Sequence, residues 1–103
     1  MAPEGREPQM GTFLAERYWP GLDEPTALSA VRRLAEQTED AGPAATARIV
    51  TCAFVPQEQT VLVLVIARSR EDVAEMGLRA DLSFDRIVDA VFLPTARAAA
   101  IDS

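Results

Sequence analysis

The chain has 103 residues, of which 49% are hydrophobic and 25% charged, with one cysteine, no histidine and a formal net charge of −6. This length is that of one domain, and the apolar share suffices for a single core. Without histidine the sequence cannot build a Ser-His-Asp triad or an HExxH zinc site, and a lone cysteine cannot form an intrachain disulfide. Because phosphate binding needs clustered cations, we expect neither nucleic acid nor an anionic membrane as a partner.

Two features of the sequence bear on where the protein works. No apolar run approaches the roughly 18 residues that cross a bilayer, and Met1–Met10 lacks the apolar centre of a signal peptide. A free thiol without an export signal is typical of a reducing compartment. The sequence therefore predicts a cytoplasmic protein.

The first half of the chain predicts a strand and then a helix. Apolar and aromatic residues alternate loosely with polar ones over Thr12–Trp19, and Pro20 and Gly21 stop the strand. Asp23 begins the helix, with a proline in its first turn, and Gly42 with the following proline ends it. The helix carries an apolar stripe at helical spacing, formed by Leu28, Val31, Leu34 and Thr38.

The second half predicts two strands, a helix and a last strand. Ala45–Val55 is a strand, and Thr60–Ala67 is a strand with apolar residues on both faces, which places it at the centre of a covered sheet. Ser69 followed by Asp72 has the form of a capping box, so a helix is expected from Arg70 to Ala80. Arg86–Leu93 is the fourth strand, and Pro94 ends it.

The order β-α-β-β-α-β predicts an α+β chain with a ferredoxin-like fold over residues 12–93, with flexible tails at residues 1–11 and 94–103. Two helices shield only one face of such a sheet. The other face would expose alternate residues of Val61–Ile66, an apolar patch that soluble monomers seldom tolerate. We therefore expect a homodimer in which two sheets pack into an α+β barrel.

Short motifs along the chain resemble a bacterial family of small α/β proteins called domain of unknown function 4242. Phe13–Arg17 followed by Trp19–Gly21 is similar to the opening strand of the family, and the similarity extends from Thr12 to Leu93. Its other pieces are Thr51–Val55, Thr60, Ala67–Ser69, Arg79, Ala80, Leu82 and Asp85–Val88. The resemblance implies a ferredoxin-like fold and a dimeric barrel, and the family includes a protein described as nickel-binding.

The sequence departs from the family pattern at two places. Asp81 and Ser83 stand where the family usually has glycine and proline, so the second helix is expected to end less sharply. The chain also lacks the imidazole nitrogens that nickel prefers. We expect no metal site and no cofactor, and any weak metal binding would rest on carboxylates.

The candidate site residues are polar side chains in the predicted strands. Glu16 lies in mid-strand, where a carboxylate needs a donor, and it is the candidate catalytic base. A cavity lined by Glu16, Arg48 and Asp89, with Tyr18 as a further donor, would bind a small hydrophobic ligand. Tyr18 and Trp19, at the end of the first strand, would either hold a flat apolar ligand or seal the barrel end against the other subunit. The alternative is that these charges form structural or interfacial ion pairs.

Other polar or reactive residues have simpler interpretations. Cys52 is expected to be a small buried hydrophobe, since no histidine is present to activate it. Arg32 and Arg33, with the acidic segment 36–40, are expected to form a solvated helix face.

Three functions remain open at this point. The first is a dimeric barrel that binds a small molecule or a metal. The second is a cofactor-independent cyclase, isomerase or small oxygenase of bacterial secondary metabolism, by analogy with other barrels of this size. The third is a structural or regulatory interaction protein whose barrel is filled with side chains.

Overall fold

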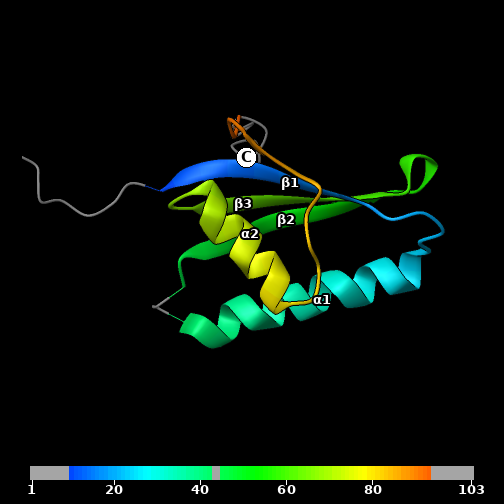
Figure 1. Ribbon diagram of the computed structural model, residues 1–103, viewed down its shortest axis with the longest axis horizontal. Helices are drawn as coiled ribbons and strands as arrows, with labels where there is room; N and C mark the ends of the chain where they lie inside the picture. The colour runs from blue at the N-terminus through cyan, green and yellow to red at the C-terminus, as the bar shows by residue number, and fades with distance from the viewer. Residues whose placement is uncertain (1–9, 43–44, 94–103) are drawn as a thin grey trace, which may run out of the picture.

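Strand β3 (Thr60–Ala67) lies inside a four-stranded antiparallel sheet, as its two-sided apolar sequence predicts. The computed structural model describes residues 10–42 and 45–93, and the sheet order is β2-β3-β1-β4. The remaining elements are β1 (Gly11–Tyr18), α1 (Glu24–Ala41), β2 (Ala47–Val55), the 3-10 turn η2 (Pro56–Glu58), α2 (Arg70–Arg79) and β4 (Arg86–Asp89). Both helices lie on one side of the sheet (Figure 1), and the predicted ferredoxin-like fold is confirmed.

The register of β3 shows how the sheet separates its two faces. β3 pairs with β1 over its full length, from Gly11 opposite Ala67 to Tyr18 opposite Thr60. Alternate residues of β3 (Val61, Val63, Val65 and Ala67) are fully buried under the helices, whereas Leu62, Leu64 and Ile66 are only partly buried. The core therefore lies between the helices and one face of the sheet, and the opposite face, which we call the open face, has no cover within the described residues.

Helix α1 begins and ends as its sequence predicts. The Oδ1 atom of Asp23 accepts a hydrogen bond from the backbone N–H of Thr26 at 2.9 Å, which satisfies a free donor of the first turn. Gly42 closes the helix at a φ of 57°, in the left-handed region that glycine adopts without a steric cost. Between these ends, Ala27, Ala30 and Leu34 are buried.

Arg33 of α1 is exposed, as expected for a solvated helix face, and it also contacts the end of α2. Its Nε atom donates a hydrogen bond to the carbonyl oxygen of Ala80, 2.9 Å away, at the end of α2. Arg32 and Glu36 are exposed, as expected. The contact was not foreseeable from the sequence because 47 positions separate the two residues.

Helix α2 ends sharply, so the expectation of a looser end is wrong. Asp81 adopts a φ of 61°, a conformation that aspartate tolerates better than most side chains. The N–H of Leu82 then donates to the carbonyl oxygen of Gly77 at 2.8 Å, as in the common glycine-terminated helix end. Asp81 therefore supplies the left-handed residue that glycine would otherwise provide.

The strands differ from the predicted ranges at their ends. β1 begins at Gly11, inside the segment predicted as a tail, and β2 begins at Ala47 rather than at Ala45. β4 ends at Asp89 rather than at Leu93, because Asp89 pairs with Phe13 and β1 has only two residues left beyond that pair. The rest of the predicted tails, residues 1–9 and 94–103, lies outside the described residues. Neither helix in the described ranges could cross a membrane.

Candidate functional site

The open face of the sheet has an apolar centre. Alternation along the strands brings together side chains from β1, β3 and β4, and all of them are partly buried: Leu14, Leu62, Leu64, Ile66 and Val88. Leu64 lies at the middle of this group, opposite Leu14 on one side and Thr51 on the other. These five side chains define the apolar patch of the open face.

Glu16 lies at one end of this patch, between Leu62 of β3 and Arg86 of β4. Its Oε2 atom is 3.5 Å from Nη1 of Arg86, and the side chain of Glu16 retains 25% of its exposure. A single contact at this distance is weak and leaves carboxylate and guanidinium positions free for other partners. Glu16 and Arg86 thus form an ion pair on the border of an apolar surface, in which the carboxylate is partly buried and the guanidinium is exposed.

Asp85 fixes the backbone around Glu16. Its N–H donates to the carbonyl oxygen of Glu16 at 2.8 Å, and its Oδ2 atom accepts from the N–H of Tyr18 at 2.6 Å. These two bonds clamp the end of β1 on both sides of Arg17. Sequence reasoning missed Arg86 and Asp85 as neighbours of Glu16, although residues 85–88 stood out in the family resemblance.

The structure does not bring Glu16, Arg48 and Asp89 together. Arg48 shares the open face, but its register opposite Ile66 places it about 15 Å from Glu16 at ordinary strand spacings. Asp89 lies opposite the buried Phe13, on the helix side, where its Oδ1 atom is 3.4 Å from Nη2 of Arg70. The polar residues at the Glu16 end of the patch are therefore Arg86 and Tyr18.

Tyr18 and Trp19 lie on opposite sides of the sheet. Tyr18 is exposed at the end of β1 on the Glu16 side. Trp19 packs against the core, with the guanidinium of Arg17 5.6 Å from its ring centroid. Arg17 also donates to the carbonyl oxygen and the hydroxyl of Ser83, at 3.1 and 3.0 Å. Trp19 thus joins a structural cluster on the helix side.

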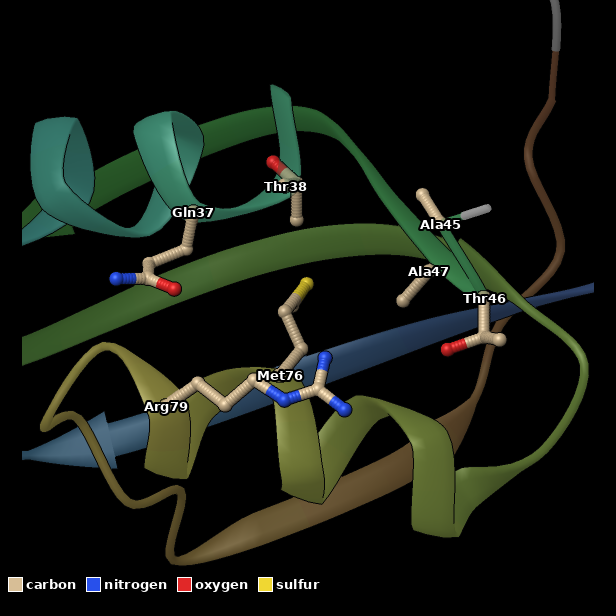
Figure 2. Close-up of a pocket in the computed structure, with 7 residues that line it drawn as sticks. All are labelled: Gln37, Thr38, Ala45, Thr46, Ala47, Met76 and Arg79. Carbon is tan, nitrogen blue, oxygen red and sulfur yellow. The ribbon is translucent and has the colours of Figure 1, made fainter. Parts of the chain in front are cut away.

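Two hollows lie away from the open face. A cavity of about 20 Å³ between the end of α1, the start of β2 and α2 has room for one water molecule, and Figure 2 shows its lining, including Met76 and Arg79. A hollow of about 190 Å³ lies between α1 and β2 and is lined by Leu28, Val31, Cys52 and Phe54, among others. Burial raises the pKa of the Cys52 thiol, which suits the expected role of a small hydrophobe.

Metal ligands do not gather in the described part of the chain. Among those residues no three side chains of cysteine, aspartate or glutamate lie close enough together to hold a metal ion. On the open face, Glu16 and Arg86 form an ion pair at one end of the patch, and Arg48 lies opposite Ile66 at the other end. The arrangement is suited to contact with an organic molecule or a second protein surface.

These features define the class of protein: a ferredoxin-like α+β domain with one apolar sheet face left uncovered by its own helices. The crystal structure of SCO4226 from Streptomyces coelicolor A3(2) is similar, with a TM-score of 0.68 over 81% of this chain and 99% of that one, at 17% sequence identity. At this identity the likeness shows the fold, that of a small bacterial α/β protein. No family model matches the chain, and a comparison with the curated proteins gave no match.

Proposed function

We propose that the chain is a homodimer that binds a small, mainly apolar molecule between the open faces of its two copies. The observation that carries the proposal is the apolar patch around Leu64 with the half-buried carboxylate of Glu16 at its border. A second copy covers this patch with an identical one, since an interface on a twofold axis is self-complementary. Burial of the patch would contribute about 25 cal/mol per Å² of apolar area.

The border of the patch supplies the polar part of the proposed binding site. Glu16 and Arg86 meet through one long contact of 3.5 Å, so each can bond a further partner. The Glu16 carboxylate is partly buried, whereas the Arg86 guanidinium is exposed in the single chain. A hydroxyl group could donate to Glu16, and a carbonyl or carboxylate group could accept from Arg86. Facing sheets lie about 10 Å apart and their side chains fill most of that space, so the proposed ligand is flat and lies at the border of the patch beside Glu16.

Membership in the family called domain of unknown function 4242 forms part of the proposal. Its support is the position of the matching motifs in the fold. Phe13–Arg17 lies within β1, and Trp19–Gly21 lies at the turn that leads to α1. The motif of residues 85–88 supplies both the clamp on Glu16 and its ion-pair partner.

A second candidate function is enzymatic, and the position of Glu16 favours it. A half-buried carboxylate beside an apolar chamber could act as a general base on a bound ligand, as in a cofactor-independent cyclase or isomerase. In that case Glu16→Gln should preserve the fold and lower turnover by about 10²-fold, the usual effect of losing a general base. A large fall in melting temperature with unchanged turnover would instead show a structural ion pair.

Sedimentation equilibrium at micromolar concentration tests the dimer. The wild-type chain should give about twice the monomer mass of 11.2 kDa. Leu64→Glu should give a monomer, because a charge buried in the patch costs several kcal/mol. Leu78→Glu is the matched control: Leu78 is 64% exposed on α2, and this variant should remain dimeric. A wild-type monomer would contradict the proposal.

Calorimetric titration with 2-naphthol, a flat apolar molecule with one hydroxyl, tests the ligand site. The dimer should bind it saturably, and Glu16→Gln should weaken binding about tenfold, the effect of losing one charge-assisted hydrogen bond. Glu75→Gln, an exposed change on α2, should bind like the wild type. A dimer that binds no 2-naphthol up to millimolar concentration would point to a barrel filled with side chains.

A further inference from the structure

The row of side chains across the Glu16 end of the open face has a polar half and an apolar half. The strand register places Arg86 of β4, Glu16 of β1 and Leu62 of β3 side by side, about 5 Å from one strand to the next. Leu14 and Tyr18 flank Glu16 on the same face, two positions before and after it on β1. A donor, an acceptor and an apolar surface thus follow one another along one line.

The two charged groups of this row have opposite hydrogen-bonding functions. A carboxylate only accepts hydrogen bonds, and a guanidinium only donates them. The Oε2 atom of Glu16 and the Nη1 atom of Arg86 are 3.5 Å apart, so both groups keep hydrogen-bonding positions for a third partner in the same place. A ligand that uses both groups must carry a donor and an acceptor next to each other on one edge.

We propose that this site binds a neutral, flat heterocycle with a lactam edge, such as a quinolone. The ring N–H donates to the carboxylate of Glu16, and the adjacent carbonyl oxygen accepts from the guanidinium of Arg86. The rest of the ring system lies over Leu62, beside the exposed ring of Tyr18. This inference rests on the proposed function and specifies the chemical class of the ligand.

The charges of the site favour a lactam over other pairs of donor and acceptor. A ring holds the N–H and the C=O of a lactam on the same side, so the two groups neither rotate nor bond to each other. A hydroxyl group next to a carbonyl group instead forms an internal hydrogen bond and loses its donor. A ligand carboxylate would meet the carboxylate of Glu16 and a chain with a net charge of −6, and like charges repel. The ion pair is neutral overall, and so is a lactam.

A second ion pair of the protein shows what sets this one apart. Glu75 and Arg79 of α2 have the same separation of 3.5 Å, but their side chains are 60% and 57% exposed. The side chain of Glu16 is 25% exposed and borders the apolar patch, so a hydrogen bond to it competes with less water. We therefore expect a lactam to bind at Glu16 and not at Glu75.

Calorimetric titration with two matched probes tests the lactam edge. 2-Quinolone has a ring N–H beside its carbonyl group, and N-methyl-2-quinolone is the same ring system without the N–H. The wild type should bind 2-quinolone at least about tenfold more tightly, the effect of one charge-assisted hydrogen bond. Glu16→Gln should reduce this preference to less than about threefold, and Arg86→Gln should weaken the binding of 2-quinolone about tenfold. Glu75→Gln is the matched control and should keep the wild-type preference.

The outcomes separate this inference from the proposed function. A dimer that binds 2-naphthol through Glu16 but binds the two quinolones equally would overturn the lactam edge and leave the ligand site in place. A dimer that binds none of the three probes up to millimolar concentration would overturn both. A preference for 2-quinolone that survives in Glu16→Gln would overturn the inference as well, since the N–H would then donate elsewhere. The comparison of the two probes on the wild type does not depend on how the variants fold.

Discussion

Arg33 in α1 ties its helix to the C-cap residue of α2 through a hydrogen bond from Nε to the carbonyl oxygen of Ala80, 2.9 Å away. The carbonyl groups at a helix C-terminus lack partners within the helix and carry the negative end of its dipole. The Arg33 guanidinium supplies both a hydrogen-bond donor and a positive charge at this position. The bond therefore fixes how the two helices lie against each other over the sheet.

Arg33→Gln should lower the free energy of unfolding by about 1 kcal/mol, the scale of a hydrogen bond between a charged donor and a partly exposed acceptor. Urea denaturation followed by circular dichroism measures the change. Arg32→Gln removes an exposed arginine one position away, and it should change stability by less than about 0.5 kcal/mol. Equal effects of the two variants would show that the bond to Ala80 contributes nothing.

Gly77→Ala should destabilise the fold, although glycine-to-alanine changes in helices usually stabilise by about 1 kcal/mol. A Cβ atom at this position would press on the carbonyl oxygen of Leu82 and come within 2.7 Å of the ring of Phe84. We expect a loss of about 1–3 kcal/mol, typical of overpacking. Thermal unfolding measures it, with Leu78→Ala at the next, exposed position as the control. A melting temperature equal to or above that of the wild type would refute the close approach.

Asp81→Gly should raise the free energy of unfolding by about 0.5–1 kcal/mol, because glycine adopts the left-handed region without the steric cost of a side chain. Asp81 has a φ of 61° and Gln59 a φ of 52°, which makes Gln59→Gly an informative comparison. Gln59 also accepts a hydrogen bond through Oε1 from the N–H of Gly21, so its replacement should bring no net gain. Chemical denaturation of both variants measures the difference, and a loss of stability in Asp81→Gly would contradict the explanation.

The cap of α1 should make stability depend on pH. Hydrogen bonding from Thr26, first from its side chain and then from its backbone, holds the pKa of the Asp23 carboxyl below its usual range. A lowered pKa in the folded state stabilises above the unfolded value of about 3.9. This contribution is lost as the pH falls through the lower, folded value.

Asp23→Asn keeps a capping oxygen but removes the titrating group. The wild type should therefore be more stable than this variant near pH 6, and the difference should shrink as the pH falls below about 4. Denaturation curves across that range measure it. Asp40→Asn, at the opposite end of α1, controls for a general loss of negative charge. A difference between wild type and Asp23→Asn that stays constant with pH would exclude the linkage.

The helices and strands, apart from the ends of the strands, could be predicted from the sequence because their signals are local. The two-sided apolar run of residues 60–67 fixed β3 as an inner strand, and it has the predicted bounds. Asp23 and Ser69 marked the starts of the helices, and each accepts the capping bond from a backbone N–H three residues later. Alternation in β1 also placed Glu16 and Arg17 on opposite faces, as the register shows.

Tertiary structure alone decided which polar side chains meet. Glu16 meets Arg86, 70 positions away, rather than Arg48, because the antiparallel register of β1 and β4 sets that pair opposite each other. Asp89 lies on the helix side with Arg70. A strand pattern fixes which residues share a face, but the register and the choice of face come from how distant strands pack against the helices. That packing placed an ion pair where the sequence had indicated a cavity with three charges.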